Sequence, residues 1–479
     1  MRRAIWLLAA CGLLGCSDEP SNRAPHILSP PPDTAAAFER YVYDLACADP
    51  DGDLVTLTRG VNDTCAGDLT DHGNRMATYG FDPDPRLAGT DCVVEVVCDD
   101  GALQDTANAT VTLLLPTDAE DLTFAPFEPW AEPIADYISE AATALGTWNF
   151  YHGIHDLAVH DHRLYIGYGD ATHNVGSLVP IEIRAWQTPD PQAIETEFVT
   201  DEEQIDRYRQ VGGRLLVPGV DATEDGLMGQ IYSLDATGWS KDRTVRWAWH
   251  AHDVTLQDND LIACGSGGTI DDYNGGTVNA YLYRRTPDAT GFEVDTQLPH
   301  PQPPGDHRLT SLLTVGSTLY ATGYWSDYSV SHATAYRHTV AGLEPWDEMS
   351  GYYVTDTLAV TPNLGLVFGV ALETTLRWAA RVVTPTGVTE ALGLAGLTVL
   401  NADPLPEGRA LILAREGDTY PSPENGPWDA VVGVTSDGQD FVELARQTFD
   451  VLPRSIAFWR HSLYLGLDDG TVWRAWGTD

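Results

Sequence analysis

Two short hydrophobic runs separated by a tight polar turn recur along the last two-thirds of the chain. In HDLAVHDHRLYIGYGD, at residues 155–170, the pattern predicts a strand, a two-residue turn, a second strand and a glycine-bearing loop. The copies lie 45 to 58 residues apart, measured at the leucine that opens each second strand: Leu164, Leu215, Leu261, Leu319, Leu366, Leu411 and Leu463. Seven four-stranded units of this size predict a seven-bladed β-propeller over residues 147–479.

The two ends of this repeat region are expected to share one blade. After Leu463 the sequence supplies a second and a third strand for the last blade, but no fourth. Residues 147–151 are aromatic and lead into a His-Asp pair, as does the outer strand that precedes the third repeat. We therefore expect residues 147–151 to complete the last blade, which removes strand edges that favour aggregation.

Residues 26–116 show short alternating strands between turn-rich segments, which predicts a small immunoglobulin-like β-sandwich. The acidic turn DPDGD at 49–53, followed by DDG at 99–101, resembles turns of bacterial cadherin-like and PKD-like surface modules. Residues 117–146 are expected to form a linker with a short helix at Ala135–Leu145. The predicted fold class is therefore all-β, a sandwich followed by a propeller.

The acidic turns carry a possible metal site. Carboxylate oxygens at alternating positions suit calcium, and the candidate ligands are Asp49, Asp51, Asp53, Asp99 and Asp100. The alternative is a solvated turn in which these aspartates cap the backbone.

Four cysteines cluster in the predicted sandwich, and four cysteines allow three pairings. Cys47 and Cys98 each lie close to an acidic turn. If the two turns are neighbours, these cysteines face each other, which leaves Cys65 to pair with Cys92. Cys264, in the propeller, is expected to stay free.

The N-terminus is typical of a targeting segment. Arg2 and Arg3 precede an apolar run at residues 4–14, too short to span a membrane. Leu-Leu-Gly-Cys at 13–16 resembles a bacterial lipobox, which implies a signal peptide at 1–15, lipidation of Cys16 and a tether at 16–25. Ser17, where an aspartate would imply inner-membrane retention, favours the outer membrane of a Gram-negative bacterium. A second lipobox match ending at Cys11 and an ordinary secretory signal are the alternatives.

The chain has 27 basic and 70 acidic residues, a formal net charge of −43 at pH 7. Such a surface repels nucleic acid and anionic lipid and attracts cations. The sequence contains no Gly-x-Ser-x-Gly, Walker loop, His-Glu-x-x-His or Cys-x-x-Cys motif, so it assigns no catalytic residue.

One face of the propeller is predicted to bind a ligand. The channel-lining first strands start there with polar residues, namely Asp156, Arg207, Asp253, Ser311, Thr357, Asp403 and Ser455. The long loops between second and third strands return to the same face, where binding residues usually lie. The candidate ligand-binding residues are Asp156, His252, Asp253, Tyr273, Trp325 and Tyr328.

Structural alternatives compete with these assignments. Asp156 and Asp253 can act as strand caps, and His250 with His252 can satisfy backbone carbonyls rather than hold a metal. Several third strands end in an aspartate, a glycine and an aromatic residue, which resembles a degenerate Asp-box hairpin. Asp-boxes are structural in sialidase-type propellers, so Asp235, Asp288 and Asp437 are expected to hold turns.

Together these features predict a lipid-anchored binding or scaffold protein, on the cell surface or in the periplasm, whose propeller recognises a glycan or protein ligand. No nucleic-acid partner is expected. The alternative is a carbohydrate-active propeller enzyme, a glycoside hydrolase or lyase, although the Arg-Ile-Pro motif of sialidase-type propellers is missing.

The anchor is tested by Cys16→Ser. We expect this variant to lose lipid labelling and to accumulate as a soluble or unprocessed form, because the thiol that carries the lipid is gone. Lipid labelling that persists in Cys16→Ser and vanishes in Cys11→Ser would show that the lipobox is misplaced.

Overall fold

The computed structural model divides the chain into two compact units, which are described separately. The residues that the structure describes are 22–36, 40–83, 91–114, 123–224, 227–301, 304–327, 329–372, 376–405, 408–419, 426–460 and 462–478. The predicted lipidation site Cys16 and the candidate Tyr328 lie outside them. In the described residues, no helix is long and apolar enough to cross a membrane.

The first unit consists of two four-stranded sheets. One has the strand order β1 (His26–Ile27), β3 (Tyr41–Ala48), β6 (Met76–Phe81) and β5 (Asp68–Gly73). The other has the order β2 (Thr34–Ala36), β8 (Gln104–Leu114), β7 (Asp91–Asp99) and β4 (Thr56–Arg59). In β3 every second side chain is buried, as expected for a strand with one face in a core. The immunoglobulin-like and cadherin-like assignments of this unit stay predictions.

Both predicted disulfides are confirmed. Cys47 of β3 and Cys98 of β7 join the two sheets, with their Cα atoms 6.4 Å apart. Cys65 pairs with Cys92 at a Cα–Cα distance of 5.1 Å. Cys264 is buried and free. The bridges constrain the unfolded chain and so stabilise a unit with a small core.

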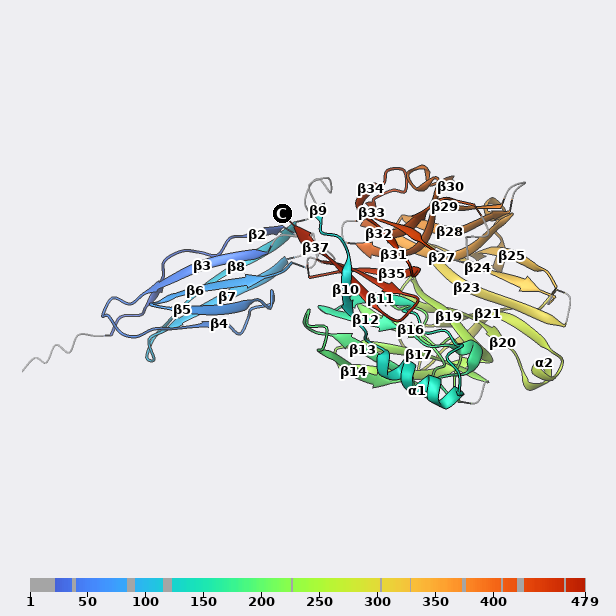
Figure 1. Cartoon of the computed structure of the whole chain (residues 1–479), viewed down its shortest axis with the longest axis horizontal. Helices are drawn as coiled ribbons and strands as arrows, with labels where there is room; N and C mark the ends of the chain where they lie inside the picture. Colours follow the sequence, from blue (N-terminus) through green and yellow to red (C-terminus); the bar gives the residue numbers. More distant parts are fainter. Residues whose placement is uncertain are drawn as a thin grey trace, which may run out of the picture. The chain divides into compact units, whose positions relative to one another are not determined.

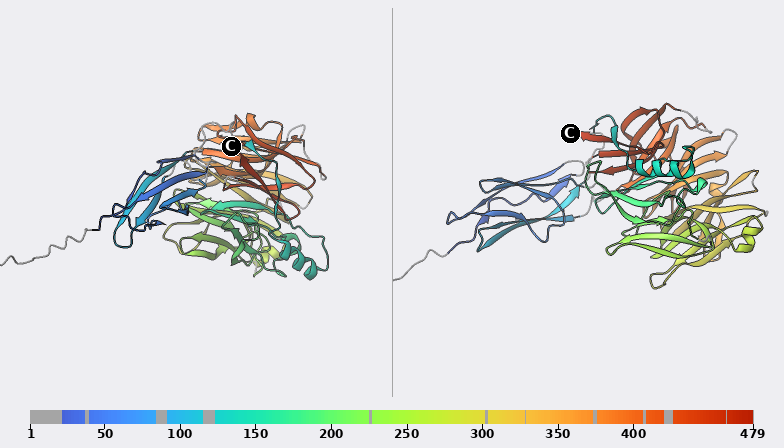
Figure 2. Two further views of the ribbon diagram at one scale, coloured as in Figure 1. Left: turned by 60° about the vertical axis from the view of Figure 1, so that its left-hand side comes forward. Right: turned by 60° about the horizontal axis from the view of Figure 1, so that its bottom comes forward.

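The second unit is the predicted seven-bladed propeller, built mostly from antiparallel meanders (Figures 1 and 2). Blade 1 comprises β11 (Asp156–His160), β12 (Arg163–Gly167), β13 (Glu182–Trp186) and β14 (Ile194–Val199). Blade 2 comprises β15 (Arg209–Val211), β16 (Arg214–Pro218), β17 (Met228–Asp235) and β18 (Gly238–Arg246). Blade 3 comprises β19 (Ala248–Gln257), β20 (Asp260–Gly267), β21 (Thr277–Arg285) and β22 (Glu293–Leu298).

The remaining blades continue the ring. Blade 4 comprises β23 (Gly305–Val315), β24 (Thr318–Ser326), β25 (Ser331–Thr339) and β26 (Gly342–Pro345). Blade 5 comprises β27 (Tyr352–Thr361), β28 (Leu364–Leu372), β29 (Leu376–Thr384) and β30 (Gly387–Glu390). Blade 6 comprises β31 (Leu397–Leu405), β32 (Arg409–Glu416), β33 (Trp428–Thr435) and β34 (Val442–Phe449). Blade 7 contains β35 (Pro453–Trp459), β36 (Ser462–Leu467) and β37 (Val472–Thr478).

A strand from the N-terminal side closes the ring, as predicted, but it is not the expected one. β10 (Glu128–Ala131), from the presumed linker, pairs with β37 to complete blade 7, and β9 (Thr123–Phe124) pairs with the end of β37. Figure 1 shows teal β10 beside red β37. Residues 147–151 form no strand. The physical reason is packing, because Trp130 of β10 contacts Trp186 of blade 1 and Tyr464 of blade 7, whereas Trp148 is 67% exposed.

Helix α1 (Ala135–Leu145) has the predicted bounds and ends at Gly146, which adopts the left-handed conformation that favours glycine. Its buried face includes Tyr137, whose ring meets Tyr168 of the loop after β12 at 4.9 Å. Arg184 of β13 donates two hydrogen bonds to Asp136. The expected linker is therefore an integral part of the propeller.

The Asp-box-like turns are confirmed at two of three positions. Asp235 accepts hydrogen bonds from the backbone and hydroxyl of Thr237, and Asp437 accepts the N–H of Gln439. The turn at Asp288 is closed by the backbone bond from Ala289 N to the carbonyl of Thr286, and the role of the Asp288 side chain stays a prediction. The aromatic position does pack between blades, since Trp239 of blade 2 meets Tyr165 of blade 1.

The closing role of Trp130 is testable by substitution. We expect Trp130→Ala to lower the free energy of unfolding of the propeller by roughly 2–4 kcal/mol, because it removes a partly buried indole between the first and last blades. Trp148→Ala is the matched control and should change stability by less than about 0.5 kcal/mol. Urea unfolding followed by tryptophan fluorescence measures both, and equal losses in the two variants would contradict this closure.

Candidate functional site

The first strand of each blade lines the central channel, and a cavity of about 340 Å³ lies along these strands. Residues from all seven blades contribute to its wall. The charged members that matter below are Asp156, Arg207, Arg209, Asp356, Asp403 and Arg454.

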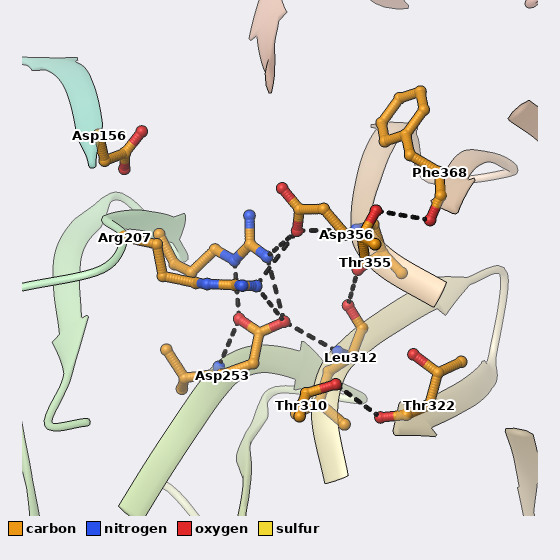
Figure 3. Close-up of polar contacts among 12 residues, drawn as sticks. Asp156, Arg207, Asp253, Thr310, Leu312, Thr322, Thr355, Asp356 and Phe368 are labelled. Carbon is orange, nitrogen blue, oxygen red and sulfur yellow. Dashed lines mark hydrogen bonds and ion pairs between the residues drawn. The ribbon is translucent and has the colours of Figure 1, made fainter. Parts of the chain in front are cut away.

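Asp253 lies beneath this cavity as a fully buried carboxylate of β19. Its Oδ1 accepts hydrogen bonds from Arg209 Nε at 2.7 Å and from Val254 N at 2.9 Å. Its Oδ2 accepts hydrogen bonds from Leu312 N at 2.8 Å and from Arg209 Nη2 at 3.1 Å. Both oxygens are therefore occupied (Figure 3), which is how a buried charge becomes tolerable.

Asp356 of β27 completes the cluster. Its Oδ1 accepts hydrogen bonds from Arg207 Nη1 and Arg209 Nη2, both at 3.1 Å, and from Thr357 N at 2.8 Å. Burial opposes its ionisation, but the two guanidinium groups outweigh this effect and hold the pKa of Asp356 below its usual range. Two cations and two anions thus neutralise each other at the centre of the ring.

Asp156 lies across the channel from this cluster (Figure 3). Burial raises its pKa to about 7, and the neighbouring carboxylates Asp403 and Asp356 add to the effect. The hydrogen bond from Tyr208 N to its Oδ2, at 2.7 Å, opposes the shift. We therefore expect Asp156 to change charge near neutral pH.

The same polar positions fasten neighbouring blades together. Asp156 of blade 1 accepts the N–H of Tyr208 at the start of blade 2, and Asp253 of blade 3 accepts the N–H of Leu312 in blade 4. Asn401 of blade 6 accepts the N–H of Ile456 in blade 7 at 3.2 Å. For Asp156 and Asp253, the interpretation as backbone caps therefore has direct geometric support, and for Asp253 it accounts for both oxygens.

The six candidate ligand-binding residues do not form one group. Asp156 lines the cavity and Asp253 lies beneath the opposite side of it (Figure 3), whereas His252 and Trp325 do not line the cavity. Trp325 of β24 stacks on His332 at 3.9 Å and meets His300 edge-on at 5.8 Å. The backbone of Tyr273 lies in the short helix α2 (Ile270–Asn274), but its side chain is not among the parts of the chain that the structure describes.

His250 and His252 make hydrogen bonds to other groups of the protein. His250 and His252 project to the same side of β19, with ring centroids 5.6 Å apart. The Nδ1–H of His250 donates to the carbonyl of Val220, and His252 Nε2 is 3.0 Å from the hydroxyl of Ser266. Burial lowers the pKa of His250 to about 4 and that of His252 well below its usual value, so both are neutral at pH 7. In the described part of the chain, no three His, Cys, Asp or Glu side chains form a group that could hold a metal.

The acidic turns of the first unit use most of their carboxylates as caps. Asp49 Oδ1 accepts the N–H groups of Asp51 and Asp53, both at 2.9 Å. Asp51 pairs with Arg23 at 2.7 Å. Asp99 accepts the N–H of Gly101, and Asp100 accepts those of residues 102 and 103. These bonds support the role of the aspartates as backbone caps, but Asp49 is buried and its Oδ2 has no partner among the described residues, and calcium binding stays a prediction.

Sequence reasoning missed Arg209. It lies two residues after Arg207, so both side chains leave the backbone on the same side of an extended segment, and that spacing was the available signal. The expected ring position of blade 5, Thr357, instead bonds the carbonyl of Leu312 at 2.7 Å, and Asp356 reaches the arginines. A register shift between Val354 and Asp356 in β27 sets this arrangement.

No model of a known protein family and no curated protein matches this chain. Solved structures with a similar fold include the β-propeller domain of the Trilobed protease from Pyrococcus furiosus, 9% identical, with a TM-score of 0.40, covering 69% of this chain and 96% of that one. Virginiamycin B lyase from Staphylococcus aureus is 13% identical, with a TM-score of 0.39 and coverages of 68% and 96%. A quinonprotein alcohol dehydrogenase-like protein from Bacteroides thetaiotaomicron is 9% identical, with a TM-score of 0.37 and coverages of 89% and 96%. These are likenesses of fold alone.

The raised pKa of Asp156 predicts a pH-dependent stability. Between pH 4 and pH 7 the unfolded chain releases the Asp156 proton while the folded chain keeps it, so this group's contribution to stability falls as pH rises. We therefore expect the free energy of unfolding of Asp156→Asn, measured relative to that of wild type, to increase by roughly 1–3 kcal/mol as pH rises from 4.5 to 7.5.

Urea unfolding across this pH range measures the difference, and Asp258→Asn, in the exposed turn after β19, is the control that should parallel wild type. A constant difference between Asp156→Asn and wild type at all pH values would show that Asp156 titrates normally.

Proposed function

We propose that this chain is an exported, lipid-anchored binding protein whose propeller recognises a glycan or protein ligand at the channel. The observation that carries this proposal is the cavity of about 340 Å³, whose charged wall is held in place by the cluster of Asp253 and Asp356 with two arginines. Its size falls at the low end of the ~300–1,000 Å³ typical of ligand sites. A rigid wall loses little entropy on binding.

The proposed location follows from two features. The lipobox-like segment supplies an anchor at Cys16, and the outer membrane of a Gram-negative bacterium is the destination that Ser17 favours. The Cys47–Cys98 and Cys65–Cys92 disulfides support a compartment outside the reducing cytoplasm. In this proposal the first unit acts as a spacer between the anchor and the propeller.

One observation favours the enzymatic alternative. Asp156 combines a pKa of about 7 with a place in the cavity wall, and groups with both properties are candidates for acid–base catalysis. A glycoside hydrolase would need a second carboxyl group, for which Asp403 is the neighbouring candidate.

A combined binding and turnover screen tests the proposal. Detergent-purified full-length protein is applied to glycan and protein arrays, and each bound ligand is then checked for reaction products. We expect binding without products, because the chain carries no catalytic motif. Product formation that disappears in Asp156→Asn would establish the enzyme instead.

The location of the site is tested with the same ligand. We expect Asp356→Asn to weaken binding at least about tenfold, whereas the exposed control Trp148→Ala should leave it unchanged. Loss of binding in Trp325→Ala, with full binding in Asp356→Asn, would move the site from the channel to the aromatic cluster of blade 4.

A further inference from the structure

The charge balance of the cavity limits the ligands that it can accept. Arg207 and Arg209 are matched by Asp253 and Asp356. The cavity wall also carries Asp156, Asp206 and Asp403, so its carboxyl groups outnumber its guanidinium groups. An anionic ligand group would meet this excess of carboxyl groups and would have to compete with Asp253 or Asp356 for an arginine. The wall therefore disfavours an anionic ligand.

The cluster nevertheless retains unused hydrogen-bonding capacity toward the cavity. Arg209 donates through Nε and Nη2, and Asp356 accepts all three of its bonds through Oδ1. Among the described residues, Arg209 Nη1 and Asp356 Oδ2 have no hydrogen-bond partner, although both side chains line the cavity. A donor and an acceptor therefore flank one fixed bond, the contact of Arg209 Nη2 with Asp356 Oδ1 at 3.1 Å.

Asp156 adds a third polar contact. Its Oδ2 accepts the N–H of Tyr208, while Oδ1 has no partner among the described residues. Asp156 lies across the channel from Asp356 (Figure 3), so the cavity has acceptors on opposite sides and a guanidinium donor on one. A hydroxyl group can donate to a carboxylate and accept from a guanidinium at once, which matches this set.

Aromatic stacking contributes little at this place. Tyr208 is the one Phe, Tyr or Trp residue among the described residues of the cavity wall, and it is buried with its hydroxyl bonded to the carbonyl of Ile166 at 2.9 Å. Recognition in the cavity would thus depend on hydrogen bonds. A ligand at the Trp325–His332 stack would instead be bound through aromatic contacts.

We propose that the channel cavity binds an uncharged sugar ring, an inference that rests on the proposed function. Neighbouring hydroxyl groups of the ring bridge Arg209 and Asp356 and reach Asp156. The cavity of about 340 Å³ accommodates one such ring. Its selectivity is for neutral over anionic sugars, because hydroxyl groups can use the free donor and acceptors, whereas a carboxylate is repelled by the carboxyl groups of the wall.

The test uses probes that share one ring and differ in charge. Glucose, galactose and mannose are the neutral probes, and glucuronate is the anionic probe. Saturation-transfer NMR and calorimetry on detergent-purified full-length protein, at fixed ionic strength, measure their affinities. We expect at least one neutral hexose to bind about tenfold or more tightly than glucuronate.

Variants locate the binding. Asp356→Asn should weaken the affinity for the neutral hexose at least about tenfold, since an amide NH₂ replaces an accepting oxygen. Asp156→Asn, which keeps an oxygen for Tyr208 N, is the second variant if Asp356→Asn fails to fold. Asp258→Asn, in an exposed turn, is the control expected to bind like wild type.

Several outcomes overturn the inference. Glucuronate binding as tight as that of the best neutral hexose, no binding of any neutral hexose, or neutral binding unaffected by both variants would each do so. The proposed function is judged separately, because a charged glycan or a protein captured on the arrays would sustain it while this inference fails.

Discussion

The centre of the ring depends on how one buried carboxylate is satisfied. Asp253 receives four hydrogen bonds, two from backbone N–H groups and two from Arg209. Leaving that carboxylate without partners would cost several kcal/mol, so the strands that supply the donors are held at fixed positions. Because Leu312 belongs to the next blade and Asp356 to blade 5, this single site couples blades 2 to 5 around the channel.

The coupling also holds the inner wall of the cavity in place. In a small barrel, apolar side chains fill the interior, but here the innermost positions are polar and their hydrogen bonds run along the wall to neighbouring blades. Bonds within the protein hold the wall in place, and Arg209, Asp356 and Asp156, which retain an unused donor or acceptor, line the cavity. The proposed binding would therefore require little rearrangement of these side chains.

Much of this fold could be predicted from the sequence, because the patterns that indicate it are local. The seven repeats, the helix at Ala135–Leu145 and the disulfides follow from periodicity, helix signals and cysteine positions. The closing strand was missed because residues 147–151 share their aromatic pattern with a true outer strand, whereas β10 is distinguished only by long-range packing of Trp130 between two blades. The contacts of Arg209 and Asp356 depend on a register shift in β27 and on blades far apart in sequence, which no local pattern encodes.

The central claim is that the channel, rather than the outer surface of the blades, is the binding site. The most direct measurement is a crystal structure of the protein with a ligand that it is shown to bind. This account predicts ligand density in the cavity, within hydrogen-bonding distance of Arg209 and Asp356, with the bonds of Asp253 to Arg209 unchanged. Density against Trp325 and His332, with the cavity holding only solvent, would contradict it.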